Sequence, residues 1–434
     1  MRVTRLPAQR LPYFGRMVVA MLLLLGGTCI AASDGPQPGQ VYREFAAHQG
    51  GDNWRVTNPL AKDPRARKFL PNPVLPLRIE ALRGAIRAEA VLDRWGGHIS
   101  TKHPRIRFNG HAWLDVPPPT KAPGDGDHER YYFQDNPVVA VPLEYLKEGD
   151  NTFEGTCSHE APDGWGQWGL YSLILRVYYD PAAVPHPTGR IVSPSSDATL
   201  GENPVIRVQA SSVSEVARVD VLAWYDGYDE DGDGVFVDWH GAHFQPRRGE
   251  AAELRDHAGT VRRAPYELTW NTRWVPDQPP RTIKLIARIQ DTQGRWYVAE
   301  PVTGLTLRRD GESVRQYRTG DVPPRFGVRN GQAKSCTITI PANHDLPTAV
   351  EAGLHYRTWH GWDKHHKPFQ LNGLAHRHEG NNHHYDYDVL PIPIKSLRNG
   401  DNTFTISSET EHHMLEVLWP GPALTVRYRI GEPR

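Results

Sequence analysis

The residues best suited to chemistry are aspartates gathered in residues 226–238. Asp229, Asp231 and Asp233 occupy alternate positions, and Gly234 follows them directly. Carboxylates at alternate positions of a tight turn converge on one hard cation, and glycine allows the bend. The spacing therefore predicts a calcium ion that fixes a loop and takes no part in catalysis. The alternative is an acidic, solvated loop between two strands.

This spacing resembles the first half of an EF-hand calcium loop, in which Asp residues alternate ahead of an invariant Gly. The position that holds the bidentate Glu of that motif is His240 here, so the second half is missing. Asp226 or Asp238 is the expected substitute on a β scaffold. The predicted metal ligands are Asp229, Asp231, Asp233 and Asp238.

Histidine is concentrated toward the end of the chain. Imidazole is a ligand for zinc or copper and a general base near neutral pH. The spacing matches no known metal signature. Adjacent residues of a strand point to opposite faces, so at most one member of each His pair could enter a common site. Surface or hydrogen-bonded structural histidines are the alternative. Ten of the 21 histidines belong to this group: His355, His360, His365, His366, His376, His378, His383, His384, His412 and His413.

Aromatic residues near expected strand ends form a third candidate set. Flat aromatic rings stack on the apolar faces of sugar rings, while nearby polar groups bind the hydroxyls. Trp165 and Trp168 lie in a Gly-rich stretch and are the leading candidates for a ligand surface. Packing against a neighbouring domain is an equally good interpretation of them. The expected ligand-binding residues are Trp165, Trp168, His98, Trp113, His384 and His413.

A long internal repeat shows which elements must position these groups. The segment Val139–Phe153 reappears as Leu390–Phe404, and Asn109-Gly110 reappears as Asn372-Gly373. Landmarks in the same order at nearly constant offset indicate one domain type present twice. Trp95 and Trp359 occupy equivalent places in the two copies, so we assign both to packing. Chemistry found in only one copy is expected to be local to that copy.

The shared landmarks resemble galactose-binding-like jelly rolls. In that family a strand ends in Asn-Gly and a later strand runs into Leu-x-x-Gly-x-Asn-x-Phe. Leu146–Phe153 and Leu397–Phe404 both fit that pattern. Gly and Asn allow the tight reversal, while Leu and Phe fill the core. The resemblance implies a jelly-roll sandwich in each copy and says little about function, because many domains of this fold only pack against neighbours.

The region between the copies has short alternating strands, and its opening Ile191-Val-Ser-Pro194 is similar to bacterial extracellular immunoglobulin-like modules. The expected fold is therefore all-β, with two jelly-roll sandwiches and a central immunoglobulin-like sandwich. The expected organisation is a signal peptide (1–32), an N-terminal extension that could add a strand (33–71), a first jelly roll (72–180), an immunoglobulin-like domain (188–308) and a second, His-rich jelly roll (322–430).

The first residues combine an arginine-rich leader with a short apolar core and a small-residue cleavage site, which predicts a secreted or periplasmic protein. Removing four arginines with this leader takes the chain from neutral to about −4, which argues against a nucleic-acid partner. No later stretch is apolar enough for a transmembrane anchor. Cys157 and Cys336 could pair or could both be buried thiols.

Three functions follow from these observations. The first is a non-catalytic secreted protein that binds carbohydrate or a cell-surface glycan, with the central domain as a calcium-braced spacer. The second is a glycan-active hydrolase or lyase with a His-rich site in the last domain, for which zinc or copper is the candidate metal. The third is a purely structural cell-envelope protein, which is favoured if the jelly rolls bury their Trp faces against the central domain.

Overall fold

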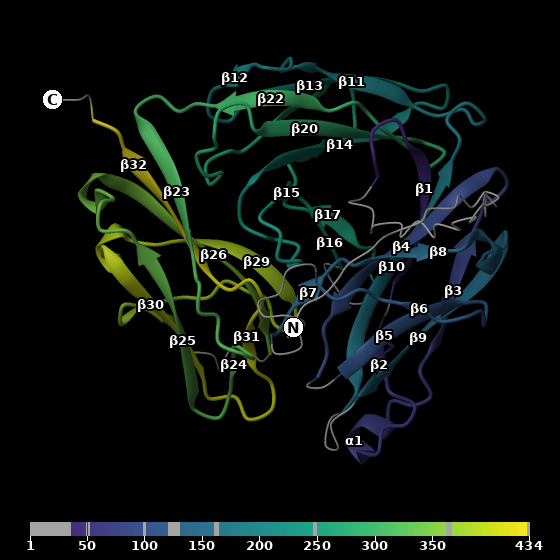
Figure 1. The fold of residues 1–434 in the computed structure, drawn as a ribbon, viewed down its shortest axis with the longest axis horizontal. Coiled ribbons are helices and arrows are strands. Elements are labelled where there is room, and N and C mark those ends of the chain that lie inside the picture. The colour runs from purple at the N-terminus through teal and green to yellow at the C-terminus, as the bar shows by residue number, and fades with distance from the viewer. Residues whose placement is uncertain are drawn as a thin grey trace, which may run out of the picture.

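A computed structural model describes residues 36–48, 50, 53–98, 101–119, 131–159, 165–245, 250–361 and 367–431. It confirms the predicted all-β fold: three β-sandwiches are arranged in a triangle, with the middle sandwich above the first and the last (Figure 1). The expected signal peptide lies outside the described residues. Within the described ranges, no helix has the length and apolarity to cross a membrane.

The first sandwich packs two sheets around one core. Strand β3 alternates exposed and buried residues along its length, as expected for a strand with one face on the core. Strand β10 is buried at every residue because it lies between β1 and β4 and is covered on both faces. One sheet contains β1 (Val41–His48), β2 (Arg55–Thr57), β4 (Ala85–Trp95), β7 (Gln134–Asp135), β8 (Val138–Val141) and β10 (Gln167–Tyr179), and the other contains β3 (Val74–Ile79), β5 (Thr101–Phe108), β6 (Leu114–Asp115) and β9 (Gly149–His159).

The last sandwich repeats this plan. Its core is built from the equivalent apolar residues, including Phe404 where the first sandwich has Phe153. One sheet contains β23 (Glu312–Arg318), β24 (Gly327–Val328), β26 (Ala349–His360), β29 (Tyr385–Pro391), β31 (Leu415–Val417) and β32 (Ala423–Arg429), and the other contains β25 (Gln332–Ile340), β27 (Phe369–Leu371), β28 (Leu374–His376) and β30 (Gly400–Ser408).

The middle sandwich lies between the two copies in sequence. Its three-stranded sheet is β11 (Thr188–Ser193), β13 (Val205–Ser211) and β19 (Tyr266–Thr269). The facing sheet contains β12 (Thr199–Leu200), β14 (Val216–Asp226), β15 (Val237–Trp239), β18 (Gly259–Val261), β20 (Ile283–Asp291), β21 (Arg295–Val298) and β22 (Val302–Leu307). A separate hairpin is formed by β16 (Ala242–Phe244) and β17 (Glu253–Arg255).

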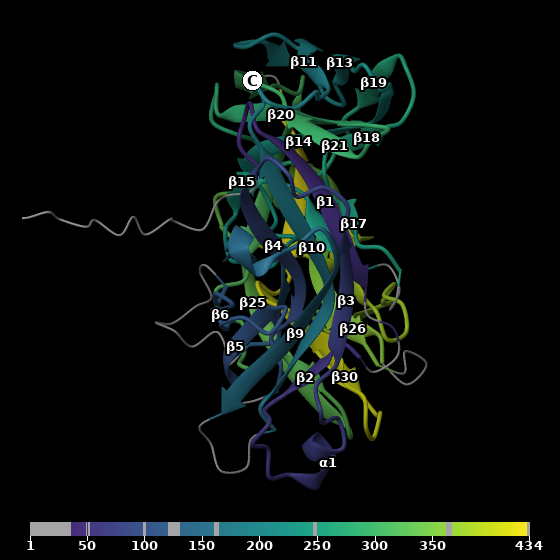
Figure 2. The same cartoon turned by 90° about the vertical axis from the view of Figure 1, so that its right-hand side faces the viewer.

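Strand β1 joins the first and middle sandwiches. It pairs antiparallel with β10 along its whole length and with β21 through residues 41–43 (Figure 2). Tyr42 is fully buried at this junction and stacks on Trp296 with ring centroids 6.0 Å apart. The N-terminal extension therefore supplies strands β1 and β2 to the first sandwich, and the two sandwiches share one continuous 13-stranded sheet. The short helix α1 (Pro64–Arg67) follows β2.

The repeated Asn residues make the same hydrogen bonds in both copies. Asn372 donates to the Asn402 side chain at 2.8 Å, and Asn402 donates to the carbonyls of Arg398 and Gly400 at 2.8 and 3.0 Å. In the first sandwich, Asn109 donates to Asn151 at 2.8 Å, and Asn151 bonds the matching carbonyls of its own loop. The repeated motif thus ties one strand end to the Gly-Asp-Asn segment that begins the next core strand, β9 in the first sandwich and β30 in the last.

Replacing Asn402 by alanine is expected to destabilise the last sandwich by about 3 kcal/mol, because several buried partners lose their hydrogen bonds. Asn402 is fully buried, and its side-chain oxygen also accepts from the Arg398 amide at 2.9 Å. Urea unfolding checks this. The matched control is Asn399→Ala, because Asn399 is exposed and only bonds the carbonyls of Pro341 and His344. Equal losses for both variants would contradict the prediction.

The two described cysteines do not pair. Cys157 is buried in the core of the first sandwich and Cys336 in the core of the last. Burial raises the pKa of the Cys336 thiol to about 12 and also raises that of Cys157. Of the two alternatives left open by the sequence, the structure therefore supports two buried thiols.

Candidate functional site

A large cleft lined by described residues lies between the first and last sandwiches. Its volume is about 980 Å³. The two walls come from segments that are far apart in the chain but adjacent in the fold. The first sandwich and the segments beside it contribute Trp54, Arg55, Arg65, Trp95, His98, Tyr132, Trp165 and Tyr171, and the last contributes Arg325, Gly327, Arg329, Gln332, Lys334, Trp359, His383, Tyr385, His412, His413, Met414 and Glu416.

The wall of the first sandwich is a continuous row of aromatic rings. Trp54 stacks on Tyr171 with centroids 5.1 Å apart and meets Trp95 edge-on at 6.0 Å. His98 lies 5.1 Å from Trp95 and 4.5 Å from Trp165. Trp54, Trp95 and Tyr171 are buried and form the floor of the cleft, whereas Trp165 is half-buried. The exposed part of the Trp165 ring is therefore available to a ligand.

The wall of the last sandwich places a second tryptophan among histidines. Trp359, near the end of β26, is half-buried and lies 5.6 Å from His383 and 6.1 Å from His413. The rings of His383 and His413 are 4.8 Å apart. Tyr385 begins β29, and its hydroxyl lies 3.2 Å from that of Tyr171 across the cleft. The two walls therefore meet at a tyrosine pair.

Charged side chains in the cleft are mainly cationic. Burial, followed by the charges of Arg55 and Arg325, lowers the pKa of His98 to about 4. Burial raises the pKa of Glu416 to about 8 against the opposing effect of Arg325. Glu416 is the acidic side chain among the described lining residues. At neutral pH, His98 is therefore uncharged and Glu416 is mostly protonated.

The pKa of Glu416 predicts a pH-dependent stability. Its folded pKa of about 8 exceeds the ordinary value of 4.5, so the folded chain holds the proton more tightly than the unfolded chain. The stability from this proton is present below pH 4.5 and is lost as pH rises through 8. The groups facing Glu416 are Arg325 and Tyr132 from neighbouring segments.

Glu416→Gln is therefore expected to raise the free energy of unfolding by a few kcal/mol at high pH. The upper bound is about 1.4 kcal/mol for each unit by which the pKa is raised. At low pH the free energy of unfolding should change little. Chemical unfolding across this pH range measures the difference. Glu411→Gln, at an exposed position beside the cleft, is the control and should not alter the pH profile. The prediction is wrong if both variants follow the wild-type profile.

Three of the six ligand-binding residues predicted from sequence come together in this cleft. Trp165 and His98 pack side by side, and His413 lies on the opposite wall. The structure places His383 in the cleft lining and His384 outside it, so His383 is the candidate for ligand contact instead of His384. One member of this His pair enters the site, as the sequence predicted, whereas both His412 and His413 line it.

The structure corrects the prediction for Trp168. Its side chain is fully buried in the core of the first sandwich, and its indole N–H donates to the Thr156 carbonyl at 3.1 Å. It cannot contact a ligand without unfolding the core. Trp113 lies outside the cleft, where the Arg107 guanidinium covers its ring at 4.3 Å.

The remaining described histidines are dispersed. His355 is buried beside Tyr387, and the Tyr387 hydroxyl lies 2.8 Å from His355 Nδ1. Burial lowers the pKa of His355 to about 3. His376 stacks on Phe369, and His360 packs edge-on against His378. Among the described residues, no three histidines bring ligand atoms together. His365 and His366 lie outside the described residues.

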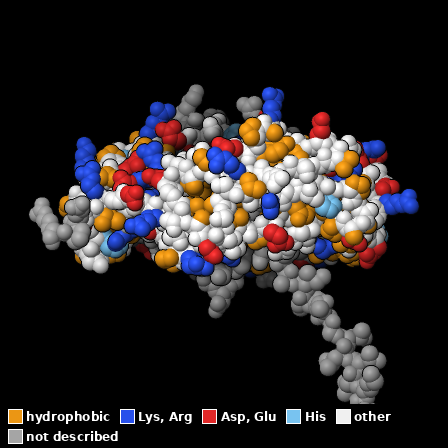
Figure 3. All heavy atoms as spheres, turned by 90° about the horizontal axis from the view of Figure 1, so that it is seen from above, with side chains coloured by type: hydrophobic (Ala, Val, Ile, Leu, Met, Phe, Trp, Pro, Cys, Tyr) orange, Lys and Arg blue, Asp and Glu red, His pale blue; other side chains and the backbone are white. Residues whose placement is uncertain are grey.

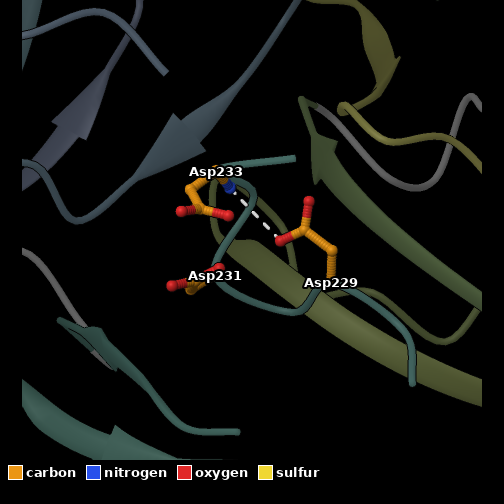
Figure 4. Close-up of side chains that lie close together, drawn as sticks. All are labelled: Asp229, Asp231 and Asp233. Atoms are coloured by element: carbon orange, nitrogen blue, oxygen red, sulfur yellow. Dashed lines mark hydrogen bonds between the residues drawn. The ribbon is translucent and has the colours of Figure 1, made fainter. Parts of the chain in front are cut away.

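Asp229, Asp231 and Asp233 do converge. Each offers a carboxylate oxygen, and these oxygens lie within 4.8 Å of one another on the loop between β14 and β15 (Figure 4). The Asp229 carboxylate also accepts from the backbone N–H groups of Gly232, Asp233 and Gly234 at 2.6, 3.2 and 2.7 Å. Gly232 and Gly234 adopt φ angles of 74° and 89°, which glycine reaches without strain, so the loop can close around Asp229.

Burial is the main influence on these carboxylates. It raises the pKa of Asp229 and of Asp233 to about 7, and it raises the pKa of Asp231 well above its usual range, with help from the Asp229 charge. Oxygen-only carboxylate sites of this kind suit calcium. Asp238 lies outside the converging group and accepts from the Trp239 backbone N–H at 2.6 Å, although its charge acts on Asp233.

The aspartate loop lies where all three sandwiches meet. A Cβ on Gly232 would overlap the guanidinium of Arg357, which itself donates to the Gln134 carbonyl at 2.8 Å. Tyr228 stacks on Tyr387 at 5.1 Å and donates to the Gly421 carbonyl at 2.8 Å. The loop of the middle sandwich thus contacts the last sandwich directly, and Arg357 links both to the first.

Sequence reasoning missed most of the cleft. The assignment to packing holds for Trp95, which is buried against Trp54 and Tyr171, but Trp359 is half-buried, and both residues line the space between the copies. Their equivalent positions in the two copies were the available signal. Trp54, Tyr171 and the cationic residues beside β24 and in β25 carried no comparable pattern, because their role depends on how the sandwiches are placed.

No family model and no curated protein matches this chain. Among solved structures, it is similar to BpGH86A, a β-porphyranase of glycoside hydrolase family 86 from the human gut bacterium Bacteroides plebeius, with 12% identity over 58% of this chain and 38% of that chain (TM-score 0.23). It is also similar to fibronectin(III)-like modules of Clostridium thermocellum CbhA, with 14% identity over 54% and 85% (TM-score 0.18).

A third similar structure is a β-D-glucuronidase from Dictyoglomus thermophilum, with 8% identity over 69% of this chain and 50% of that chain (TM-score 0.19). This chain thus spans about two fifths of the porphyranase and half of the glucuronidase.

Proposed function

We propose that this chain is a secreted, non-catalytic protein that binds a glycan in the cleft between its first and last sandwiches. The observation that carries the proposal is the aromatic lining, in which half-buried Trp165 and Trp359 lie above a floor of buried rings. Such rings stack on the apolar faces of sugars, and the nearby His, Gln and Arg side chains offer polar contacts to hydroxyls.

We also propose that the sandwiches are two galactose-binding-like jelly rolls and an immunoglobulin-like spacer, and that calcium braces the spacer against them. The three converging carboxylates support the calcium site, because Asp229, Asp231 and Asp233 supply the oxygen ligands that this ion prefers. Calcium bound there would offset the mutual repulsion of the buried Asp229 and half-buried Asp231 and Asp233 carboxylates and hold the loop at the junction of the three sandwiches.

A panel of polysaccharides tests the proposed function. We expect the protein to be retarded in affinity electrophoresis by at least one polysaccharide, and binding to be confirmed by calorimetry with an oligosaccharide of that polymer. No retardation and no heat across a broad panel of neutral and acidic polymers would overturn the proposal. The purely structural alternative predicts that outcome.

The enzymatic alternative is tested with the same polymers. Hydrolysis by the usual two-carboxylate routes needs a pair of acids across the cleft. Glu416 is the acid among the described lining residues, and its raised pKa would suit a proton donor. Incubation of bound polymers with the protein should leave their length unchanged. Chain shortening that disappears in Glu416→Gln would establish catalysis in place of simple binding.

A further inference from the structure

The cleft differs from the whole chain in its charge. The full sequence carries 50 Lys and Arg against 50 Asp and Glu, for a formal net charge of +0. The described cleft lining instead contains one acid, Glu416, and the cations Arg55, Arg65, Arg325, Arg329 and Lys334. The positive excess is therefore a local property of this cleft.

Two of these cations have no carboxylate partner among the described residues. Arg329 donates to the His412 carbonyl at 3.3 Å, and Lys334 donates to the carbonyls of Pro324, at 3.3 Å, and Arg325. Backbone carbonyls orient these side chains but carry no formal charge. Arg65 contributes least to the positive charge of the cleft, because its guanidinium pairs with the Asp63 carboxylate at 2.6 Å. Both Arg329 and Lys334 are half-buried, so water screens their charge less than it screens a fully exposed side chain.

Neighbouring groups respond to this positive field. Burial is the main cause that lowers the pKa of Lys334, and the charge of Arg325 lowers it further. The charges of Arg55, Arg325 and Arg65 act in the same direction on His98. By contrast, the outer face of the middle sandwich carries Lys, Arg, Asp and Glu side chains interspersed (Figure 3). Clustering of one sign of charge in a concave site raises the local concentration of oppositely charged ligands.

Resting on the proposed function, we infer that the ligand of this cleft is an anionic polysaccharide, whose carboxylate or sulfate groups pair with Arg329, Lys334 and Arg325 while its sugar rings stack on Trp165 and Trp359. These three cations lie on the wall of the last sandwich together with Trp359, and Trp165 faces them from the wall of the first sandwich. A sugar polymer that bears a charged group beside an apolar ring face satisfies both walls at once. A neutral glycan offers these cations no opposite charge.

Matched polymers that differ only in charge test this inference. Polygalacturonate is compared with its methyl ester, and dextran sulfate with dextran, so that the two pairs separate carboxylate from sulfate recognition. We expect the charged member of at least one pair to bind about tenfold or more tightly than its neutral partner, and this preference to shrink as salt is raised. A single-stranded oligonucleotide serves as a polyanion that lacks pyranose rings.

The double variant Arg329→Gln/Lys334→Gln should lose about tenfold in affinity for the charged polymer and change little for the neutral one. The matched control is Arg308→Gln/Lys395→Gln, which removes two exposed cations outside the cleft. It should bind like the wild type. Thermal unfolding shows whether each variant is folded, and single substitutions replace the double variant if it is not.

Each outcome decides between specific alternatives. Equal binding of charged and neutral partners, with Trp165 still required, would overturn the inference and leave glycan binding intact. Binding of the oligonucleotide as tightly as the best polysaccharide would also overturn it, because the site would then recognise polyanions in general. Absence of binding to every polymer would overturn the proposed function and the inference together.

Discussion

Replacing Trp165 by alanine is expected to weaken glycan binding by about tenfold or more, equivalent to about 1.4 kcal/mol. Trp165 is the half-buried ring of the first wall, held by His98 at 4.5 Å and by the Arg65 guanidinium at 5.1 Å. Alanine removes the platform on which a sugar ring would stack and leaves the buried floor intact. Calorimetric titration with the oligosaccharide that binds the wild type measures the effect.

Trp113→Ala is the matched control for this change. Trp113 is also a half-buried tryptophan of the first sandwich, and Arg107 stacks on its ring as Arg65 does on Trp165. It lies outside the cleft, so its loss should leave affinity unchanged. If Trp113→Ala weakened binding as much as Trp165→Ala, or if Trp165→Ala bound normally, the cleft would not be the binding site.

Calcium is expected to stabilise the protein by about 2.7 kcal/mol when its free concentration is about 100 times Kd, and chelator should remove this gain. Asp231→Asn should abolish the calcium response. Asp231 is the better position for this test, because the Asp229 carboxylate also accepts three backbone N–H groups and its loss would disturb the loop by itself. Melting temperatures in calcium and in chelator give the comparison.

Asp310→Asn provides the control, since Asp310 is an exposed aspartate far along the chain from the loop. Its melting temperature should rise with calcium as that of the wild type does.

Asp238→Asn separates the two ligand sets. A retained calcium response supports the converging group of three, and a lost calcium response supports the four ligands expected from sequence. A wild-type melting temperature that is the same in calcium and in chelator would contradict the calcium site.

The parts of the structure that sequence could predict are those encoded by local contacts. The Asn402 and Gly400 turn recurs in both copies because its hydrogen bonds join residues within four positions of one another, together with one neighbouring strand end. The aspartate trio was equally accessible, since Asp229, Asp231 and Asp233 are brought together by one short loop.

The parts that failed depend on contacts between distant segments. Alternation along β10 could not show that Trp168 is in the core, because every residue of that strand is buried. His383 lies before β29 and has a φ of 62°, so strand alternation did not determine which member of the pair would enter the cleft. The distance between Trp165 and the cationic residues of the last sandwich depends on how the sandwiches dock, and no local pattern encodes that.

Co-crystallisation with the oligosaccharide that binds most tightly tests the central claim most directly. Glycan binding in the cleft predicts a sugar ring stacked on Trp165 or Trp359, with an anionic group within hydrogen-bonding distance of Arg329 or Lys334. An oligosaccharide found elsewhere on the protein, with the cleft free of sugar, would contradict it.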